Sequence, residues 1–145
     1  MSSIFTKIIA GEIPGKFVWA DDDVVAMATI EPVRPGHVMV IPRAEVPKFN
    51  DVDPEVFAHA MKVAQIIANA QEKAFGVERS VVTILGFEVP HTHIHVIPAE
   101  SESAANLHKA SAAPAADITK AMMELRNALF ELGYGEHVPE YMDAL

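Results

Sequence analysis

Apolar residues in this chain recur at two spacings, and the shorter one, at every second position, is typical of β-strands. Such alternation, or a short β-branched run, predicts strands at residues 16–20, 23–30, 37–41, 79–85 and 91–98. The first two enclose an acidic turn and are expected to form a hairpin. Successive side chains of a strand point to opposite faces, so each segment can turn one apolar face toward a core.

The longer spacing, of three and four residues, predicts three α-helices. A short N-terminal helix is stopped by Gly11. A long helix is expected between Asp53, which suits the N-cap, and Gly76, and its apolar stripe is assigned to the core. A third helix, capped by Asp117, is expected to end at Gly133, with a stripe that faces either its own domain or a second subunit.

These elements describe one α+β domain with an antiparallel five-stranded sheet, a short N-terminal helix, a long central helix and a C-terminal helix. We expect residues 1–100 to form its core, and residues 101–145 to supply a linker, a helix and a tail packed on the same domain. Residues 100–117 are rich in Ala and Ser, and a mobile connection is expected there. His59 lies off the stripe of the long helix and is expected to be a solvated surface histidine.

Composition and charge narrow the possible functions. A length of 145 residues suits one domain, and 50% apolar residues allow a substantial core. The formal net charge of −9 argues against sequence-independent binding of nucleic acid, which needs clustered Lys and Arg. The chain contains no cysteine, which excludes disulfides and Cys-based metal sites. No basic start precedes a long apolar run, so a cytoplasmic protein without a membrane partner is expected.

The most informative polar pattern places His91, His93 and His95 at every second position, so that a strand would carry three imidazoles on one face. Such neighbours lie about 6.6 Å apart, which is awkward for three ligands of one small ion. Metal binding or sequestration is therefore the weaker alternative. Imidazole is a nucleophile that titrates near neutral pH, and the row suits attack on a phosphate.

The spacing His-x-His-x-His resembles the signature of the histidine triad (HIT) proteins. Residues 35–42, Pro-Gly-His-Val-Met-Val-Ile-Pro, resemble the Gly-His strand of that family, and residues 3–14 resemble its N-terminal opening. The resemblance spans about the first hundred residues. It implies a HIT-like fold, a homodimer, and a nucleotide-binding hydrolase or nucleotidyl transferase. The implied substrates are nucleoside phosphoramidates or dinucleoside polyphosphates, attacked at the α-phosphate without a metal or other cofactor.

The resemblance also implies roles for individual residues. His93 would attack the phosphorus and form a covalent nucleotidyl-histidine intermediate, His95 would hydrogen-bond the phosphoryl oxygens, and His91 and His37 would support the site. The residues implied to contact the nucleotide are Ile4, Phe5, Ile8, Met27, Thr29, Ile30, Gly86 and Glu88.

Three features depart from the family pattern. Ser3 and Thr6 stand where some members carry a Cys-x-x-Cys pair as part of a zinc site. Thr29 stands where an acidic or amide residue would hold the ribose, and Glu88 where a hydroxyl would bind the phosphate. The short loop is expected to turn Glu88 outward, because Pro90 restricts the backbone before the histidines. Thr29 and Glu88 favour an alternative function, a nucleotide-binding regulatory protein with weak or no catalysis.

Overall fold

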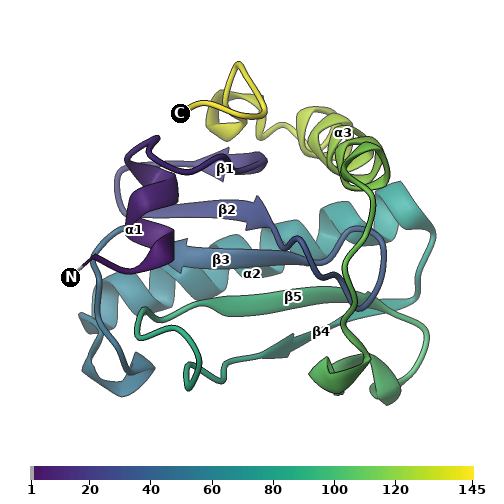
Figure 1. Cartoon of the computed structure of the whole chain (residues 1–145). Coiled ribbons are helices and arrows are strands. Elements are labelled where there is room, and N and C mark those ends of the chain that lie inside the picture. Colours follow the sequence, from purple (N-terminus) through teal and green to yellow (C-terminus); the bar gives the residue numbers. More distant parts are fainter. Residues whose placement is uncertain (1) are drawn as a thin grey trace.

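The computed structural model describes residues 2–145 and contains one antiparallel sheet of five strands in the order β1-β2-β3-β5-β4 (Figure 1). The strands are β1 (Phe17–Ala20), β2 (Val24–Ala28), β3 (Val38–Pro42), β4 (Arg79–Thr83) and β5 (Ile94–Ala99). Every neighbouring pair in this order is antiparallel. The predicted α+β fold with a five-stranded antiparallel sheet is confirmed.

Three α-helices pack on this sheet: α1 (Ile4–Ile9), α2 (Pro54–Phe75) and α3 (Ala115–Glu131). The long α2 runs behind the sheet in Figure 1, α1 lies over the opposite face, and α3 packs against α2 and β1. Asp53 begins α2 by accepting hydrogen bonds from the amides of residues 55 and 56. Gly76, with φ +65°, ends it as predicted.

The alternation of side chains along the central strands decides what each face of the sheet carries. Ala26 and Val40 are paired across β2 and β3 and belong to the core beneath α2 and α3. Met27 and Met39, one position along, belong to a separate apolar cluster on the α1 side. His95 pairs with Met39 across β3 and β5. Because directly paired residues project from the same face, this register puts His95 on the α1 side of the sheet.

A buried amide ties α2 to the sheet beside the histidines. Gln71 is fully buried, and its side-chain nitrogen donates to the carbonyl oxygens of Gly36 and Val96, each at 2.9 Å. Its oxygen accepts from the hydroxyl of Ser80. One side chain therefore connects α2 with β4, β5 and the turn that precedes β3, and it fixes the backbone next to His37.

Several predicted strand ends were wrong. The expected strand 91–98 begins only at Ile94, since the backbone N–H and the hydroxyl of Thr92 both donate to the carbonyl of Val46 in the β3–α2 loop, each at 2.8 Å. The strand expected at 23–30 stops at Ala28, and the one expected at 79–85 stops at Thr83. The Gly-His strand begins one residue after its histidine.

The C-terminal part differs from the prediction in its start. The first turn of α3 follows Pro114, and Asp117 lies inside that turn instead of capping it. Proline at this position presets the backbone angle and explains the earlier start. Residues 102–105 and 107–109 form short 3-10 turns, and Ala104 packs against Ile97 of β5. The apolar stripe of α3 faces its own domain, because its buried residues belong to the main core.

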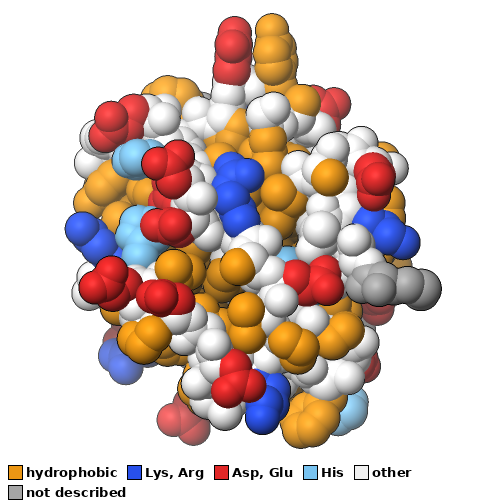
Figure 2. All heavy atoms as spheres, turned by 90° about the vertical axis from the view of Figure 1, so that its left-hand side faces the viewer, with side chains coloured by type: hydrophobic (Ala, Val, Ile, Leu, Met, Phe, Trp, Pro, Cys, Tyr) orange, Lys and Arg blue, Asp and Glu red, His pale blue; other side chains and the backbone are white. Residues whose placement is uncertain are grey.

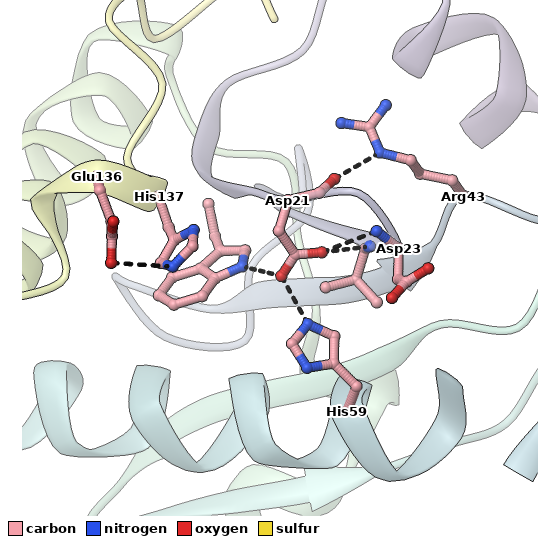
Figure 3. Close-up of polar contacts among 8 residues, drawn as sticks. Asp21, Asp23, Arg43, His59, Glu136 and His137 are labelled. Carbon is pink, nitrogen blue, oxygen red and sulfur yellow. Dashed lines mark hydrogen bonds and ion pairs between the residues drawn. The ribbon is translucent and has the colours of Figure 1, made fainter. Parts of the chain in front are cut away.

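His59 is only partly exposed and is bound to a carboxylate, whereas a solvated surface residue was predicted. Its Nε2 lies 2.6 Å from Oδ2 of Asp21, which also accepts from Nε1 of Trp19 at 2.8 Å (Figure 3). The ring of His137 stacks on Trp19 with centroids 4.6 Å apart. These contacts bring α2 and the C-terminal segment against the turn between β1 and β2. The sequence could not predict them because the contacting residues are far apart along the chain.

No helix in the described part of the chain combines the length and the apolar character needed to cross a membrane. Figure 2 looks at the end of the molecule that lies to the left in Figure 1, and acidic side chains are scattered over it among apolar ones. This distribution agrees with the excess of Asp and Glu, 20 against 11 Lys and Arg.

Candidate functional site

Four histidines converge where β5 begins beside α1. The rings of His93 and His95 lie with centroids 5.0 Å apart, and the ring of His37 lies 5.1 Å from that of His95. Phe5 of α1 packs edge-on against His93 at 4.8 Å and against His91 at 5.7 Å. The structure therefore brings together all four histidines that were predicted to form the site.

The ring of His93 has one nitrogen committed to the backbone and the other free. Its Nδ1 lies 2.8 Å from the carbonyl oxygen of His91. A carbonyl oxygen can only accept, so Nδ1 carries the proton and the neutral ring keeps a lone pair on Nε2. Nε2 of His93 has no hydrogen-bond partner among residues 2–145. Every buried side-chain nitrogen or oxygen of these residues has one, so Nε2 is not buried. This nitrogen is therefore open to solvent or to a ligand.

The proton positions of His37 and His95 follow from a backbone donor. The N–H of Val33 donates to Nδ1 of His37 at 3.1 Å, which leaves the proton of the neutral His37 ring on Nε2. That nitrogen lies 2.9 Å from Nδ1 of His95 and donates to it. The proton of the neutral His95 ring is consequently on its own Nε2. His95 thus presents a hydrogen-bond donor next to the lone pair that His93 presents.

Burial keeps these rings neutral. Desolvation lowers the pKa of His37 to about 3, with a further contribution from the charge of His95. Desolvation likewise lowers the pKa of His95 to about 4, assisted by His93. The pKa of His93 is also lowered, mainly by burial, although its bond to the His91 carbonyl and the charge of Glu88 act in the opposite direction. At neutral pH the site therefore holds an unprotonated nucleophile and a neutral donor.

His91 differs from His93 because the protein occupies both of its ring nitrogens. It is 0% exposed, with Nε2 2.7 Å from the carbonyl oxygen of Pro42 and Nδ1 2.7 Å from Oγ of Ser3. The expectation of three histidines on one strand face is thus wrong, because only His95 lies in β5 and both His91 and His93 precede it. Both of its ring nitrogens are used by the protein, and neither is available to a substrate.

A family model described as HIT domain matches residues 10–102. The chain belongs to the HIT family. Purine nucleoside phosphoramidase of Escherichia coli is 36% identical over 101 residues, which cover 66% of this chain and 85% of that protein. A bis(5'-nucleosyl)-tetraphosphatase of Schizosaccharomyces pombe is 38% identical over 82 residues, which cover 50% of this chain and 43% of that enzyme.

Solved structures of HIT proteins share the fold. The structure of a Zn-bound histidine triad family protein from Mycobacterium smegmatis superposes with a TM-score of 0.81 at 26% identity, covering 93% of this chain and 98% of that one. The family membership predicted from the histidine pattern is therefore confirmed, and two of the relatives carry the names of nucleotide-processing enzymes.

Zinc does not fit the start of α1, where some family members carry a Cys-x-x-Cys pair. Ser3 and Thr6 offer hydroxyls there, whereas zinc sites are built from thiolates, imidazoles and carboxylates. Within residues 2–145, no three His, Cys, Asp or Glu side chains are arranged to hold a metal ion. The hydroxyls are instead hydrogen-bonded to His91 and to Glu45.

The residues predicted to contact the nucleotide fall into two groups. Phe5 and Met27 are buried in one apolar cluster, and Ile8 packs against it, next to His93. Ile4 is 47% exposed, and Ile30 is 76% exposed on the loop after β2. The structure thus gathers Phe5, Ile8 and Met27 beside the histidines, whereas neither Ile4 nor Ile30 belongs to their cluster.

Two of the residues that depart from the family pattern, Thr29 and Glu88, lie on loops: the first is hydrogen-bonded to the backbone and the second is exposed. The hydroxyl of Thr29 accepts the N–H of Glu31 at 3.2 Å and so stabilises a local turn. Glu88 is exposed, and its charge acts on His93. Gly86 has φ +81°, a backbone conformation that glycine adopts readily, and it turns the chain toward Glu88.

Two surface hollows of about 390 and 340 Å³ lie away from these histidines. Residues of α3 and of the C-terminal segment contribute to their walls, and no histidine does. The candidate site is therefore defined by the arrangement of the four histidines and not by the volume of a surface hollow.

Sequence reasoning missed three groups that decide the protonation of the histidines: the N–H of Val33, the carbonyl of Pro42 and the carboxylate of Glu45. Backbone groups carry no sequence signal of their own. Glu45 meets Ser3 across 42 positions of the chain, so no local pattern could indicate the contact.

Proposed function

We propose that this HIT protein is a nucleotidyl hydrolase or transferase that acts on the α-phosphate of a nucleoside phosphoramidate or a dinucleoside polyphosphate. The observation that carries the proposal is the tautomer of His93. Its Nδ1 proton is held by the carbonyl of His91, and this leaves a neutral ring with an accessible lone pair on Nε2. A neutral imidazole with a free nitrogen can act as a nucleophile near neutral pH without metal activation.

In the first step, Nε2 of His93 forms a bond to the α-phosphorus, and the leaving group departs with the electron pair of its bond to phosphorus, taking a proton from solvent when it is an amine. The His93 ring then bears hydrogen on Nδ1 and phosphorus on Nε2, and so carries a positive charge. The carbonyl of His91 already points at Nδ1–H and stabilises this developing charge without reorganisation. In the second step, the oxygen of water or of another acceptor bonds to phosphorus and releases its proton to solvent, while the bond from phosphorus to Nε2 breaks and restores the neutral His93 ring.

His95 supports both steps as a hydrogen-bond donor to the phosphoryl oxygens. Its proton is on Nε2 because Nδ1 accepts from His37. The donor matters here because the phosphoryl oxygens gain negative charge as the nucleophile approaches. A neutral donor also avoids placing a second positive ring beside the cationic His93 intermediate, a point supported by the lowered pKa of His95.

The apolar cluster on the α1 side is proposed to accept the base. Phe5, Ile8 and Met27 lie beside His93, and a flat heterocycle can pack on such side chains. Ribose contacts by Thr29 and phosphate contacts at Gly86 and Glu88 belong to the same proposal. The hydroxyl of Thr29 already accepts one backbone N–H, but it keeps its own proton for a ribose oxygen.

A nucleotide-binding regulator without appreciable catalysis is the second candidate. It is favoured by the exposed carboxylate of Glu88 near His93, because a negative group opposes an incoming phosphate. Both candidates bind nucleotide, and only the first forms a covalent adduct.

Assembly and location complete the proposal. The edge strand β4 has one side without a strand partner among residues 2–145, a geometry that suits pairing with a second copy in a homodimer. A cytoplasmic location belongs to the same proposal. Sedimentation of the purified protein tests the dimer.

The direct test of the function is a substrate panel. Adenosine and guanosine phosphoramidates and dinucleoside polyphosphates are incubated with the protein, and release of nucleoside monophosphate is followed by chromatography. Turnover that is lost in His93→Ala supports the enzyme. Tight binding of the same compounds by calorimetry, with no release, supports the regulator instead.

A further inference from the structure

The N-terminal end of α1 and the loop after β3 meet at the buried ring of His91. On one side of the ring, Nε2 lies 2.7 Å from the carbonyl oxygen of Pro42. On the other side, Nδ1 lies 2.7 Å from Oγ of Ser3, and both side chains are buried. Because the carbonyl can only accept, the proton of a neutral His91 ring is on Nε2, and Nδ1 needs a donor.

The surrounding hydrogen bonds decide where the Ser3 proton points. Oγ of Ser3 accepts the N–H of Thr6 at 3.1 Å, and its own proton has two acceptors within reach, Nδ1 of His91 at 2.7 Å and Oγ1 of Thr6 at 3.3 Å. The hydroxyl of Thr6 lies 2.7 Å from Oε1 of Glu45, a carboxylate that can only accept. The Thr6 proton is therefore given to Glu45. Of the two acceptors left for the Ser3 proton, Nδ1 of His91 is the nearer, at 2.7 Å against 3.3 Å for Oγ1 of Thr6, and receives it.

Glu45 receives a second hydrogen bond, from the backbone N–H of Ser3 at 2.6 Å. The bonds from Ser3 and Thr6 lower the pKa of Glu45 and keep it ionised. The carboxylate thus holds the start of α1 in the orientation that presents the Ser3 hydroxyl to His91. Ser3 and Thr6 stand at the two positions where some family members are expected to carry zinc-binding cysteines.

We propose that Ser3 is a positioning residue whose hydroxyl fixes His91 as the neutral Nε2–H tautomer, with Thr6 and Glu45 holding that hydroxyl in the donating direction. The effect on catalysis rests on the proposed function, whereas the tautomer itself does not. His91 matters to the reaction because its carbonyl oxygen accepts the Nδ1 proton of His93. Clamping the His91 ring on both sides keeps that carbonyl aimed at the nucleophile.

The neutral state of His91 is the one that the reaction requires. His93 becomes positively charged when Nε2 bonds to phosphorus, and Phe5 contacts the rings of both His91 and His93. A positive His91 would repel the developing charge, and this interaction already lowers the pKa of His93. The titratable groups that act on His91 are His93, on the same segment, and Glu45, on the β3–α2 loop.

The tautomer is tested on the unmodified protein. Long-range ¹H–¹⁵N spectra of the histidine rings at pH 7 are expected to show an unprotonated Nδ1 and a protonated Nε2 for His91, identified by its loss in His91→Gln. A doubly protonated ring, or a proton on Nδ1 alone, overturns the proposal. This measurement needs no substrate, so it is independent of whether the protein is an enzyme.

Two variants of equal shape test the role of the Ser3 proton. Ser3→Asn and Ser3→Asp both provide good N-caps for α1, but only Asn retains a donor for His91. In Ser3→Asp, both nitrogens of His91 face acceptors, so the ring is expected to be doubly protonated at pH 7. We expect its kcat for a nucleoside phosphoramidate to be at least tenfold below that of Ser3→Asn, with KM values within threefold.

A neutral His91 in Ser3→Asp, or equal kcat in the two variants, contradicts the proposal. If circular dichroism shows that either variant is unfolded, Ser3→Thr and Ser3→Val provide the same comparison, because the two side chains share one shape and only Thr keeps a hydroxyl. Loss of kcat in the Val variant alone is expected, and equal loss in both overturns the role. If wild type itself releases no nucleotide, the proposed function fails, while the ring spectra still decide the tautomer.

Discussion

Nε2 of His37 donates a hydrogen bond of 2.9 Å to Nδ1 of His95, although 58 residues separate the two in the chain. The direction of this bond is set by the N–H of Val33, which occupies the other nitrogen of His37. His37 is therefore a positioning residue that decides which nitrogen of His95 can donate to a phosphate.

Replacing His37 tests this relay. His37→Leu removes the donor to His95 and also leaves the N–H of Val33 without its acceptor, so we expect kcat to fall about a hundredfold and stability to fall by about 1–3 kcal/mol. His37→Gln keeps an N–H donor and is expected to retain more activity. Steady-state kinetics at pH 7 and urea unfolding measure both effects. A Leu variant with kcat within threefold of the exposed control His108→Leu would refute the relay.

The rate should depend on pH through the protonation of His93. The pKa of this ring is lowered, mainly by burial, from an ordinary value near 6.5. Attack needs the neutral ring, so we expect the acid-side decline of kcat/KM to have its midpoint below the ordinary histidine value of about 6.5. A pH profile of phosphoramidate hydrolysis measures this. A midpoint at or above pH 6.5 would show that burial does not depress the nucleophile.

Acid stability should depend on Asp21. Burial raises its pKa, but hydrogen bonds from Trp19, His59 and two backbone amides outweigh this effect and lower the pKa to about 2. Since the folded value lies below the unfolded one, the stabilisation is present above about pH 4 and is lost as the pH falls toward 2. We expect Asp21→Asn to be less stable than wild type at pH 7, with a difference that shrinks between pH 4 and 2.

The fluorescence of Trp19, the single tryptophan, reports unfolding in both proteins. The depressed pKa values of His37 and His95 also remove stability as the pH falls below 6.5, but they do so equally in both proteins. A difference between wild type and Asp21→Asn that stays constant down to pH 2 would contradict the role of the Asp21 hydrogen bonds.

Gly36 offers a matched comparison of strain and packing. It has φ +91°, and a Cβ there would overlap the ring of Phe75. Gly133 has φ +95° with nothing within 4 Å of the same position. Gly133→Ala should therefore cost about 1–2 kcal/mol from backbone strain alone, and Gly36→Ala about 1–3 kcal/mol more. Urea unfolding measures both, and equal losses would show that Phe75 moves aside freely.

Much of the fold could be predicted because local patterns determine it. Asp53 and Gly76 mark the ends of α2 through capping chemistry, and the alternation around Met27 marks β2. The site was predicted less completely. His93, His95 and His37 gather as expected, but the inward position of His91 depends on contacts with Pro42 and Ser3 that lie 49 and 88 positions away. His59 was misjudged for the same reason, since its partner Asp21 belongs to a distant turn.

Formation of a covalent adduct on His93 tests the central claim most directly. The protein is mixed with an adenosine phosphoramidate, quenched within milliseconds in alkaline denaturant and digested, and the peptides are analysed by mass spectrometry. The account predicts an adenylyl group on the peptide that contains His93, absent in His93→Ala and retained in His108→Ala. Turnover without any adduct, an adduct on a different histidine, or near wild-type turnover by His93→Ala would contradict it.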